Sequence, residues 1–79
     1  MENFSEKDFL SAFGKNVRKL RKQQGFTQAQ LANDIGSEIS QISRIERGII
    51  NTSVGNVNAI ATALQVDPRE FFNFSKSSS

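Results

Sequence analysis

The chain has 79 residues and a formal net charge of +2, and 37% of its residues are hydrophobic and 23% charged. This length indicates one domain with a modest core, and this composition is typical of a soluble globular protein. The sequence contains neither Cys nor His, which excludes thiol nucleophiles, disulfides, the commonest general base and almost all transition-metal sites. The acids stand singly and no glycine-rich phosphate loop occurs, so we expect no enzyme activity, no cofactor and no metal ion.

The sequence contains no run of about 18 apolar residues that would predict a membrane span, and no signal peptide opens the chain. We therefore expect a cytoplasmic protein with no membrane partner and no small-molecule ligand. The positive charges are unevenly placed, because no acid occurs between Asp8 and Asp34 while cations crowd the segment 15–22. Such a run is either a solvated helix face or a source of positive potential for a phosphate backbone.

Capping signals predict five helices and no strand. The first helix begins at Ser5, whose hydroxyl can accept from the amide of Asp8, and ends at Gly25. Its inward stripe consists of Phe9, Phe13, Val17 and Leu20. The second helix begins at Thr27, which forms a capping box with Gln30, and it ends before Gly36.

The third helix is expected over 38–47, with Ser37 or Glu38 as its cap and Gly48 as its stop. On a helical wheel of about 100° per residue, one side is apolar and carries Ile42, Ile45 and Ile49. The opposite side has hydroxyls and guanidiniums and no acid, from Ser40, Ser43, Arg44 and Arg47. The first side predicts core, and the second predicts a surface suited to DNA.

The last two helices begin after Ser53 and at Asp67. In the fifth helix, Pro68 takes the first position and Glu70 completes a capping box. We assign Phe71 and Phe72 mainly to the core. Residues 1–74 are expected to form the single domain, and the Ser-rich segment 75–79 to be a disordered tail.

Two short helices joined by a tight turn at Gly36 form a helix-turn-helix layout. The residues that carry a more specific pattern are Arg21, Gly25-Phe26-Thr27-Gln28, Leu31-Ala32, Ile35-Gly36, Ile42-Ser43-Arg44-Ile45-Glu46-Arg47-Gly48, Asn51, Ile60-Ala61, Ala63-Leu64 and Phe71-Phe72. Over about residues 12–72 the chain resembles the phage-repressor-like helix-turn-helix family (Cro/repressor, or xenobiotic-response-element type). The resemblance implies a compact, all-α, five-helix, lambda-repressor-like DNA-binding domain, similar to small stand-alone regulators such as restriction–modification controller proteins.

By this resemblance, the recognition helix 38–47 lies in the major groove of DNA. The expected base contacts are Ile39, Ser40, Gln41, Ser43 and Arg44. The expected phosphate contacts are Thr27, Gln28, Arg47, Asn51 and Thr52. The resemblance also implies a structural ion pair between Arg21 and Glu46, which would hold the recognition helix against the first helix.

The leading end of the recognition helix leaves two alternatives open. Ile39 either meets a thymine methyl group or packs back onto the core. Glu38 either caps the helix, where the dipole favours an acid, or accepts a hydrogen bond from a cytosine.

One domain of this size contacts few bases, so we expect a homodimer on a two-fold symmetric operator, with Phe74 at the dimer interface. The expected function is that of a small transcriptional regulator, a repressor or autoregulator that joins the nucleoid when bound to DNA. Two alternatives are an antitoxin that represses its own operon and a protein-interaction module that has lost DNA binding.

Overall fold

The computed structural model describes residues 4–74. Within that range the chain forms four α-helices and one short 3₁₀-helix, with no strand. The elements are α1 (Glu6–Gln23), α2 (Gln28–Ile35), α3 (Ile39–Glu46), α4 (Val54–Leu64) and η1 (Pro68–Phe72). The all-α prediction is confirmed. The predicted tail, 75–79, lies outside the described residues.

The predicted helix starts are confirmed for α1, α2 and α4. The Ser5 hydroxyl accepts from the Asp8 amide at 3.1 Å and so caps α1. Thr27 and Gln30 form the capping box of α2, with bonds of 3.0 Å and 2.8 Å. Ser53 caps α4 in the same way as Ser5 caps α1. These starts follow from sequence because each cap satisfies backbone amides only a few residues away.

The α3 helix is one residue shorter at each end than the predicted 38–47. Glu38 stands at its N-cap position, with no side-chain hydrogen bond to the helix. At the other end Gly48 takes a left-handed conformation, with φ of 72°. The chain therefore leaves the helical register before Ile49, whose side chain is 59% exposed rather than part of the core.

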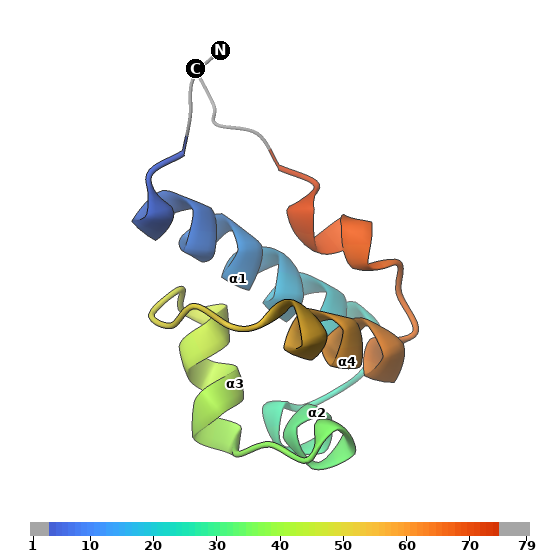
Figure 1. Cartoon of the computed structure of the whole chain (residues 1–79). Helices are drawn as coiled ribbons and strands as arrows, with labels where there is room; N and C mark the ends of the chain where they lie inside the picture. Colours follow the sequence, from blue (N-terminus) through green and yellow to red (C-terminus); the bar gives the residue numbers. More distant parts are fainter. Residues whose placement is uncertain (1–3, 75–79) are drawn as a thin grey trace.

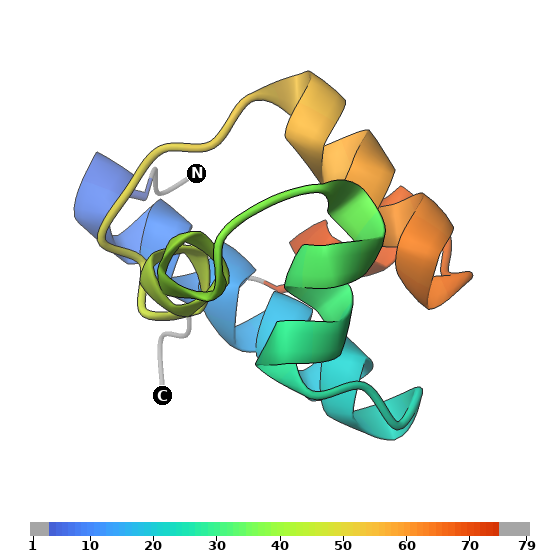
Figure 2. The ribbon, with the colours of Figure 1, turned by 90° about the horizontal axis from the view of Figure 1, so that it is seen from below.

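The core lies where α1, α2, α3, α4 and η1 meet. Its fully buried members are Val17, Leu31, Ile42, Ile45, Ile60, Leu64 and Phe71. Figure 1 shows α1 lying between η1 and α3, with α2 at the far end of α3. Seen from below, α3 points almost along the line of sight and α2 lies beside it (Figure 2). No helix in the described part of the chain is long and apolar enough to cross a membrane.

The fifth helix is a 3₁₀-helix of five residues, not the predicted α-helix. The predicted capping box does not form, because the Asp67 carboxylate accepts from the backbone and guanidinium of Arg69 instead. Phe71 is fully buried, but Phe72 is 43% exposed, so only one of the two rings assigned to the core lies in it. The side-chain amide of Asn16 in α1 donates through Nδ2 to the backbone carbonyl of Phe71 at 3.1 Å and so joins η1 to α1.

The α1 and α3 helices approach closely at a glycine that the sequence did not single out. A Cβ atom at Gly14 would meet the carbonyl oxygens of Ile45 and Glu46. One turn earlier in α1, the backbone of Ser11 lies against Gly48, where an added Cβ would be 2.7 Å from the Ser11 Cα. These two contacts fix the C-terminal end of α3 on α1.

Candidate nucleic-acid interface

The outward face of α3 is polar and accessible. Ile42 and Ile45 are buried, whereas Ser40, Arg44 and Arg47 are exposed. Gln41 and Ser43 are half-buried at the two edges of this face. The helix therefore divides into core and surface as its sequence pattern predicts.

Ile39 lies on the accessible side of α3, at its first position. Its side chain is 52% exposed, so it does not fold back onto the core. Glu38 precedes it and is exposed as well. The leading end of α3 thus presents an apolar group and an acid side by side.

A buried ion pair holds the other side of α3. The guanidinium of Arg21 donates through Nε to Glu46 Oε2 at 2.6 Å and through Nη2 to Glu46 Oε1 at 3.1 Å. Its Nη1 donates to the carbonyl of Phe26 at 2.7 Å. In the described residues no buried side-chain polar atom lacks a partner. Every buried donor of this cluster therefore has a hydrogen-bond acceptor. These bonds fix the position of α3 on α1.

The N-terminus of α2 is joined to the same carboxylate. Gln28 Nε2 donates to Glu46 Oε1 at 3.0 Å. This bond uses one amide hydrogen and leaves the other free. Unpaired backbone amides at a helix N-terminus also attract anions. Gln28 and Thr27 are therefore placed where a phosphate would be favourable.

Two of the expected phosphate contacts, Thr27 and Thr52, have a hydroxyl oxygen that already accepts a hydrogen bond within the chain. Thr27 Oγ1 accepts from the Gln30 amide, and Thr52 Oγ1 accepts from the side chain of Asn56 at 2.8 Å. Each O–H hydrogen then remains to donate. Arg47 donates through Nε to the Ser43 carbonyl at 3.3 Å, which leaves its terminal nitrogens free of that bond. Because a phosphate only accepts hydrogen bonds, these groups match it.

Residues 17–71 match the family model described as Helix-turn-helix. The chain belongs to the helix-turn-helix family. The restriction–modification controller protein C.AhdI from Aeromonas hydrophila has a similar structure, with a TM-score of 0.77 and 41% identity over 80% of this chain and 96% of that chain. Control protein C.BamHI from Bacillus amyloliquefaciens is 36% identical over 63 residues, which make up 78% of this chain and 78% of that protein.

Longer proteins are similar as well. The uncharacterised helix-turn-helix-type transcriptional regulator y4wC of Sinorhizobium fredii is 32% identical over 59 residues. These residues make up 75% of this chain but only 41% of that protein, so this chain spans less than half of that relative's length. The family is one of DNA-binding transcriptional regulators and not of enzymes.

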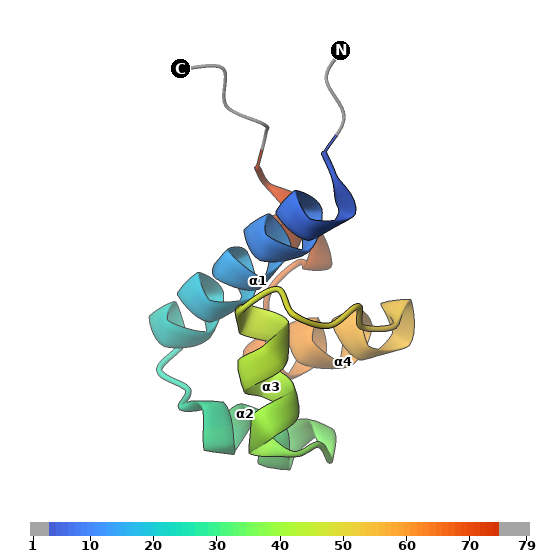
Figure 3. The same ribbon diagram turned by 90° about the vertical axis from the view of Figure 1, so that its left-hand side faces the viewer.

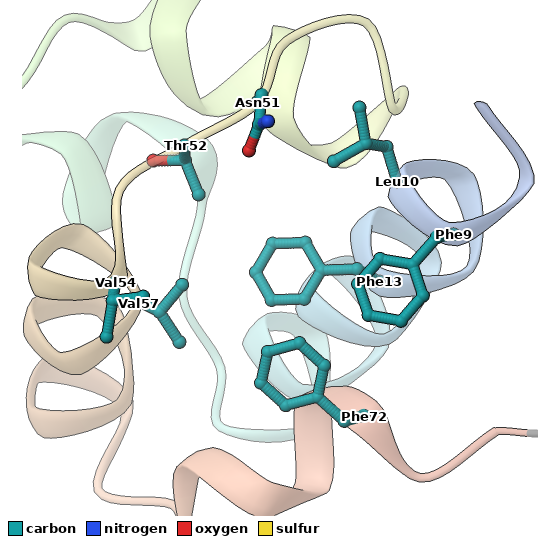
Figure 4. A pocket seen from close by; sticks show the side chains of 8 residues that line it. All are labelled: Phe9, Leu10, Phe13, Asn51, Thr52, Val54, Val57 and Phe72. Atoms are coloured by element: carbon teal, nitrogen blue, oxygen red, sulfur yellow. The ribbon is translucent and has the colours of Figure 1, made fainter. Parts of the chain in front are cut away.

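An apolar groove that the sequence analysis did not predict lies between α1, α4 and η1. It is an open cavity of about 180 Å³ lined by Phe9, Leu10, Phe13, Asn51, Thr52, Val54, Val57 and Phe72. Figure 4 shows the phenyl rings from α1 and η1 facing the two valines of α4. Val54 is 86% exposed and Phe9 is 41% exposed. The apolar residue at the first position of α4, directly after the Ser53 cap, was the sequence signal for this surface.

Phe74, the residue expected at a dimer interface, is half-buried and packs within its own chain. Its ring lies 5.2 Å from that of Phe4 and 5.4 Å from that of Phe9, both in edge-to-face geometry. The ring of Phe9 also stacks on Phe72 at 6.1 Å. Phe74 therefore supports one wall of the groove from behind.

Asp67, at the N-cap of η1, forms an ion pair with Arg69 in the first turn of η1 at 2.7 Å. The hydrogen bond from the Arg69 side chain lowers the pKa of Asp67 below its ordinary value. Both residues are exposed.

Proposed function

We propose that this chain binds double-stranded DNA sequence-specifically as a small homodimeric transcriptional regulator. The observation that supports this most strongly is the outward face of α3. That face combines exposed Ser40, Arg44 and Arg47 with a rear side fixed by the buried pair of Arg21 and Glu46. A rigid helix with free hydrogen-bond donors fits the major groove, where guanidiniums and hydroxyls meet base edges and phosphates.

In this proposal the base contacts come from α3. Arg44 is the main reader, because Arg to guanine O6 and N7 is the commonest specific contact. Ser40, Gln41 and Ser43 read neighbouring bases, and exposed Ile39 contacts a thymine methyl group. The apolar alternative for Ile39, packing onto the core, does not fit its exposure.

The phosphate contacts flank the recognition helix on two sides. Thr27 and Gln28 bind one backbone at the N-terminus of α2. Arg47, Asn51 and Thr52 bind a backbone from the end of α3 and the loop that follows. The free donors on Thr27, Gln28 and Thr52 support these assignments.

The dimer forms, in this proposal, across the groove between α1, α4 and η1, where Phe9, Val54 and Phe72 are exposed. Phe74 contributes from behind, through its contact with Phe9. Asn51 and Thr52 line the groove and also face the proposed DNA, so a partner there lies next to the same duplex. The domain measures 38 × 20 × 20 Å. Two such domains side by side place their α3 helices a few tens of ångströms apart, the scale of half-sites about 34–36 Å apart.

The similarity to two controller proteins favours a cytoplasmic regulator of the controller type. In this proposal it acts as a repressor that also represses its own promoter. Selection of binding sites from random duplex DNA tests the proposal. We expect a two-fold symmetric motif, and an affinity that falls linearly with salt on logarithmic axes. Selection that enriches no motif, with no salt-dependent binding to any duplex, contradicts the proposal and favours a protein-interaction module.

A further inference from the structure

Four cations form a stripe along α1, outside the surfaces assigned so far. Lys15 stands three residues before Arg18 and four before Lys19, and these two stand four and three residues before Lys22, so all four share one face of the helix. All four are exposed, and they are Lys15, Arg18, Lys19 and Lys22. We call this set the α1 stripe.

The α1 stripe has no compensating charge in the described structure. The ion pairs among residues 4–74 join Arg21 to Glu46 and Arg69 to Asp67, and neither includes a stripe residue. Like charges at these helical spacings repel and destabilise the helix. A surface helix normally interleaves both signs, whereas no acid occurs here between Asp8 and Asp34. The stripe is therefore suited to a polyanion that supplies the missing charge.

The position of the stripe continues the proposed DNA surface. Arg18 lies one turn after Gly14 and one turn before Arg21, and both of these α1 residues contact α3. The stripe thus adjoins the end of α3 where Arg47 is exposed. Arg21 also donates to the Phe26 carbonyl, which places the second half of α1 next to the start of α2. Figure 3 shows this half of α1 above α2 and beside α3.

The stripe also stays accessible in the proposed dimer. Phe9 and Phe13 line the groove. On the helical wheel they lie about half a turn from the centre of the stripe, so they are on the opposite side of α1. A partner in the groove therefore leaves the stripe uncovered and turned away from the dimer axis.

We propose that the α1 stripe binds the DNA backbone that flanks each half-site. The inference rests on the proposed function, since it needs α3 in the major groove. The occupant is the continuing duplex rather than an acidic protein, because the stripe lies on the helix that contacts both α3 and the segment before α2, beside the proposed phosphate contacts. Each flanking phosphate that a Lys or Arg neutralises releases condensed counterions and so steepens the salt dependence of binding.

The test compares two duplexes that carry the same selected operator. One ends at the outer edges of the half-sites, and the other extends by roughly one helical turn, about 10 base pairs, at each end. The variant is Arg18→Gln/Lys22→Gln, because Gln matches Lys and Arg in helix propensity. The control, Lys7→Gln/Arg69→Gln, removes the same charge outside the stripe.

For the wild type and the control, we expect a steeper salt dependence on the longer duplex, by about 0.9 in logarithmic slope for each added phosphate contact. The stripe variant, which keeps Lys15 and Lys19, should lose the part of that increment that Arg18 and Lys22 supply, and it should keep the slope on the short duplex. Equal wild-type slopes on both duplexes overturn the inference. An equal loss for the variant on both duplexes also overturns it, since it indicates a general charge effect or a partner other than flanking DNA. A wild type with no salt-dependent affinity for the short duplex instead overturns the proposed function itself.

Discussion

The carboxylate of Glu46 in α3 accepts two hydrogen bonds from the guanidinium of Arg21 in α1, at 2.6 Å and 3.1 Å. Only 7% of the Arg21 side chain and 2% of the Glu46 side chain are exposed. The same carboxylate accepts from Gln28 in α2 at 3.0 Å. One buried group therefore joins three helices and sets the position of α3 relative to the N-terminus of α2.

Replacement of Glu46 with Ala should leave the Arg21 guanidinium buried, with the Phe26 carbonyl as its remaining protein acceptor. We expect Glu46→Ala to lower the free energy of unfolding by about 3–5 kcal/mol, because an unpaired buried charge costs far more than the pair contributes. Thermal unfolding followed by circular dichroism measures the change. An unchanged Tm would show that the pair does not support the fold.

The matched control is the double variant Arg21→Met/Glu46→Leu, which removes both charges and keeps most of the volume. It should unfold at a higher temperature than Glu46→Ala, since a hydrophobic pair of similar volume is often neutral. If the double variant instead loses as much free energy of unfolding as the single variants Arg21→Met and Glu46→Leu lose together, the two residues are not coupled.

Gly14 should not tolerate a side chain. An added Cβ would lie 2.6 Å from the carbonyl oxygen of Glu46. This oxygen belongs to the backbone of α3, so it cannot move away as the end of a flexible side chain could. We expect Gly14→Ala to destabilise the fold by about 1–3 kcal/mol in urea denaturation, although Ala is the better helix former. Gly55→Ala is the control, because the atom nearest to its Cβ position is Ser53 Oγ, at 3.9 Å. That variant should be stabilised by about 0.5–1 kcal/mol. Equal effects of the two changes would contradict the close approach of α1 and α3.

The helix starts could be predicted from the sequence because capping is local. Ser5, Thr27 and Ser53 each satisfy an amide three residues away, so the relevant geometry lies within one turn. The division of α3 into an apolar and a polar face followed from periodicity in the same way. The pair of Arg21 and Glu46, 25 residues apart, came only with the family resemblance.

The errors concern positions that depend on tertiary structure. The wheel placed Ile49 in the core, but the left-handed Gly48 ends the helical register before it. In η1, the 3₁₀ geometry turns Phe72 out toward the groove while Phe71 stays buried. A helical wheel drawn with α-helical spacing cannot predict which of these two rings is buried. The role of Gly14 was not visible either, because it depends on which carbonyl groups of α3 face α1.

Two single substitutions should separate base reading from backbone binding. We expect Arg44→Ala to relax the selected motif at one base position, with a loss of about 1–3 kcal/mol of discrimination there. Gln28→Ala should weaken binding to every sequence alike, because phosphate contacts carry no sequence information. Binding-site selection with each variant measures both effects. The same motif for Arg44→Ala and the wild type would remove Arg44 from the base contacts.

Glu38 stands before α3 without a side-chain bond to it. As an exposed acid near the proposed DNA surface, it should repel phosphates without reading a base. We expect Glu38→Gln to raise the affinity for the selected operator and for a scrambled duplex by the same factor, measured at constant salt. A gain on the scrambled duplex alone would instead show that Glu38 accepts from a cytosine in the operator.

The proposed dimer predicts that a charge in the groove separates the subunits. Val54 is 86% exposed, so replacing it removes little from the core of one subunit. Val54→Asp places an acid at the first position of α4, where the helix dipole favours it, and the fold should be kept. In the dimer the same carboxylate would be taken out of water against Phe9 and Phe72, at a high free-energy cost.

Sedimentation at high micromolar concentration, with and without operator DNA, measures the outcome. We expect a dimer for the wild type and a monomer for Val54→Asp. Asn58→Asp is the matched control, since it adds the same charge to α4 at an exposed position outside the groove, and it should remain a dimer. A wild type that stays monomeric even with DNA refutes the dimer. A dimeric Val54→Asp keeps the dimer but moves its interface away from the groove, because an uncompensated pair of carboxylates could not stay buried there.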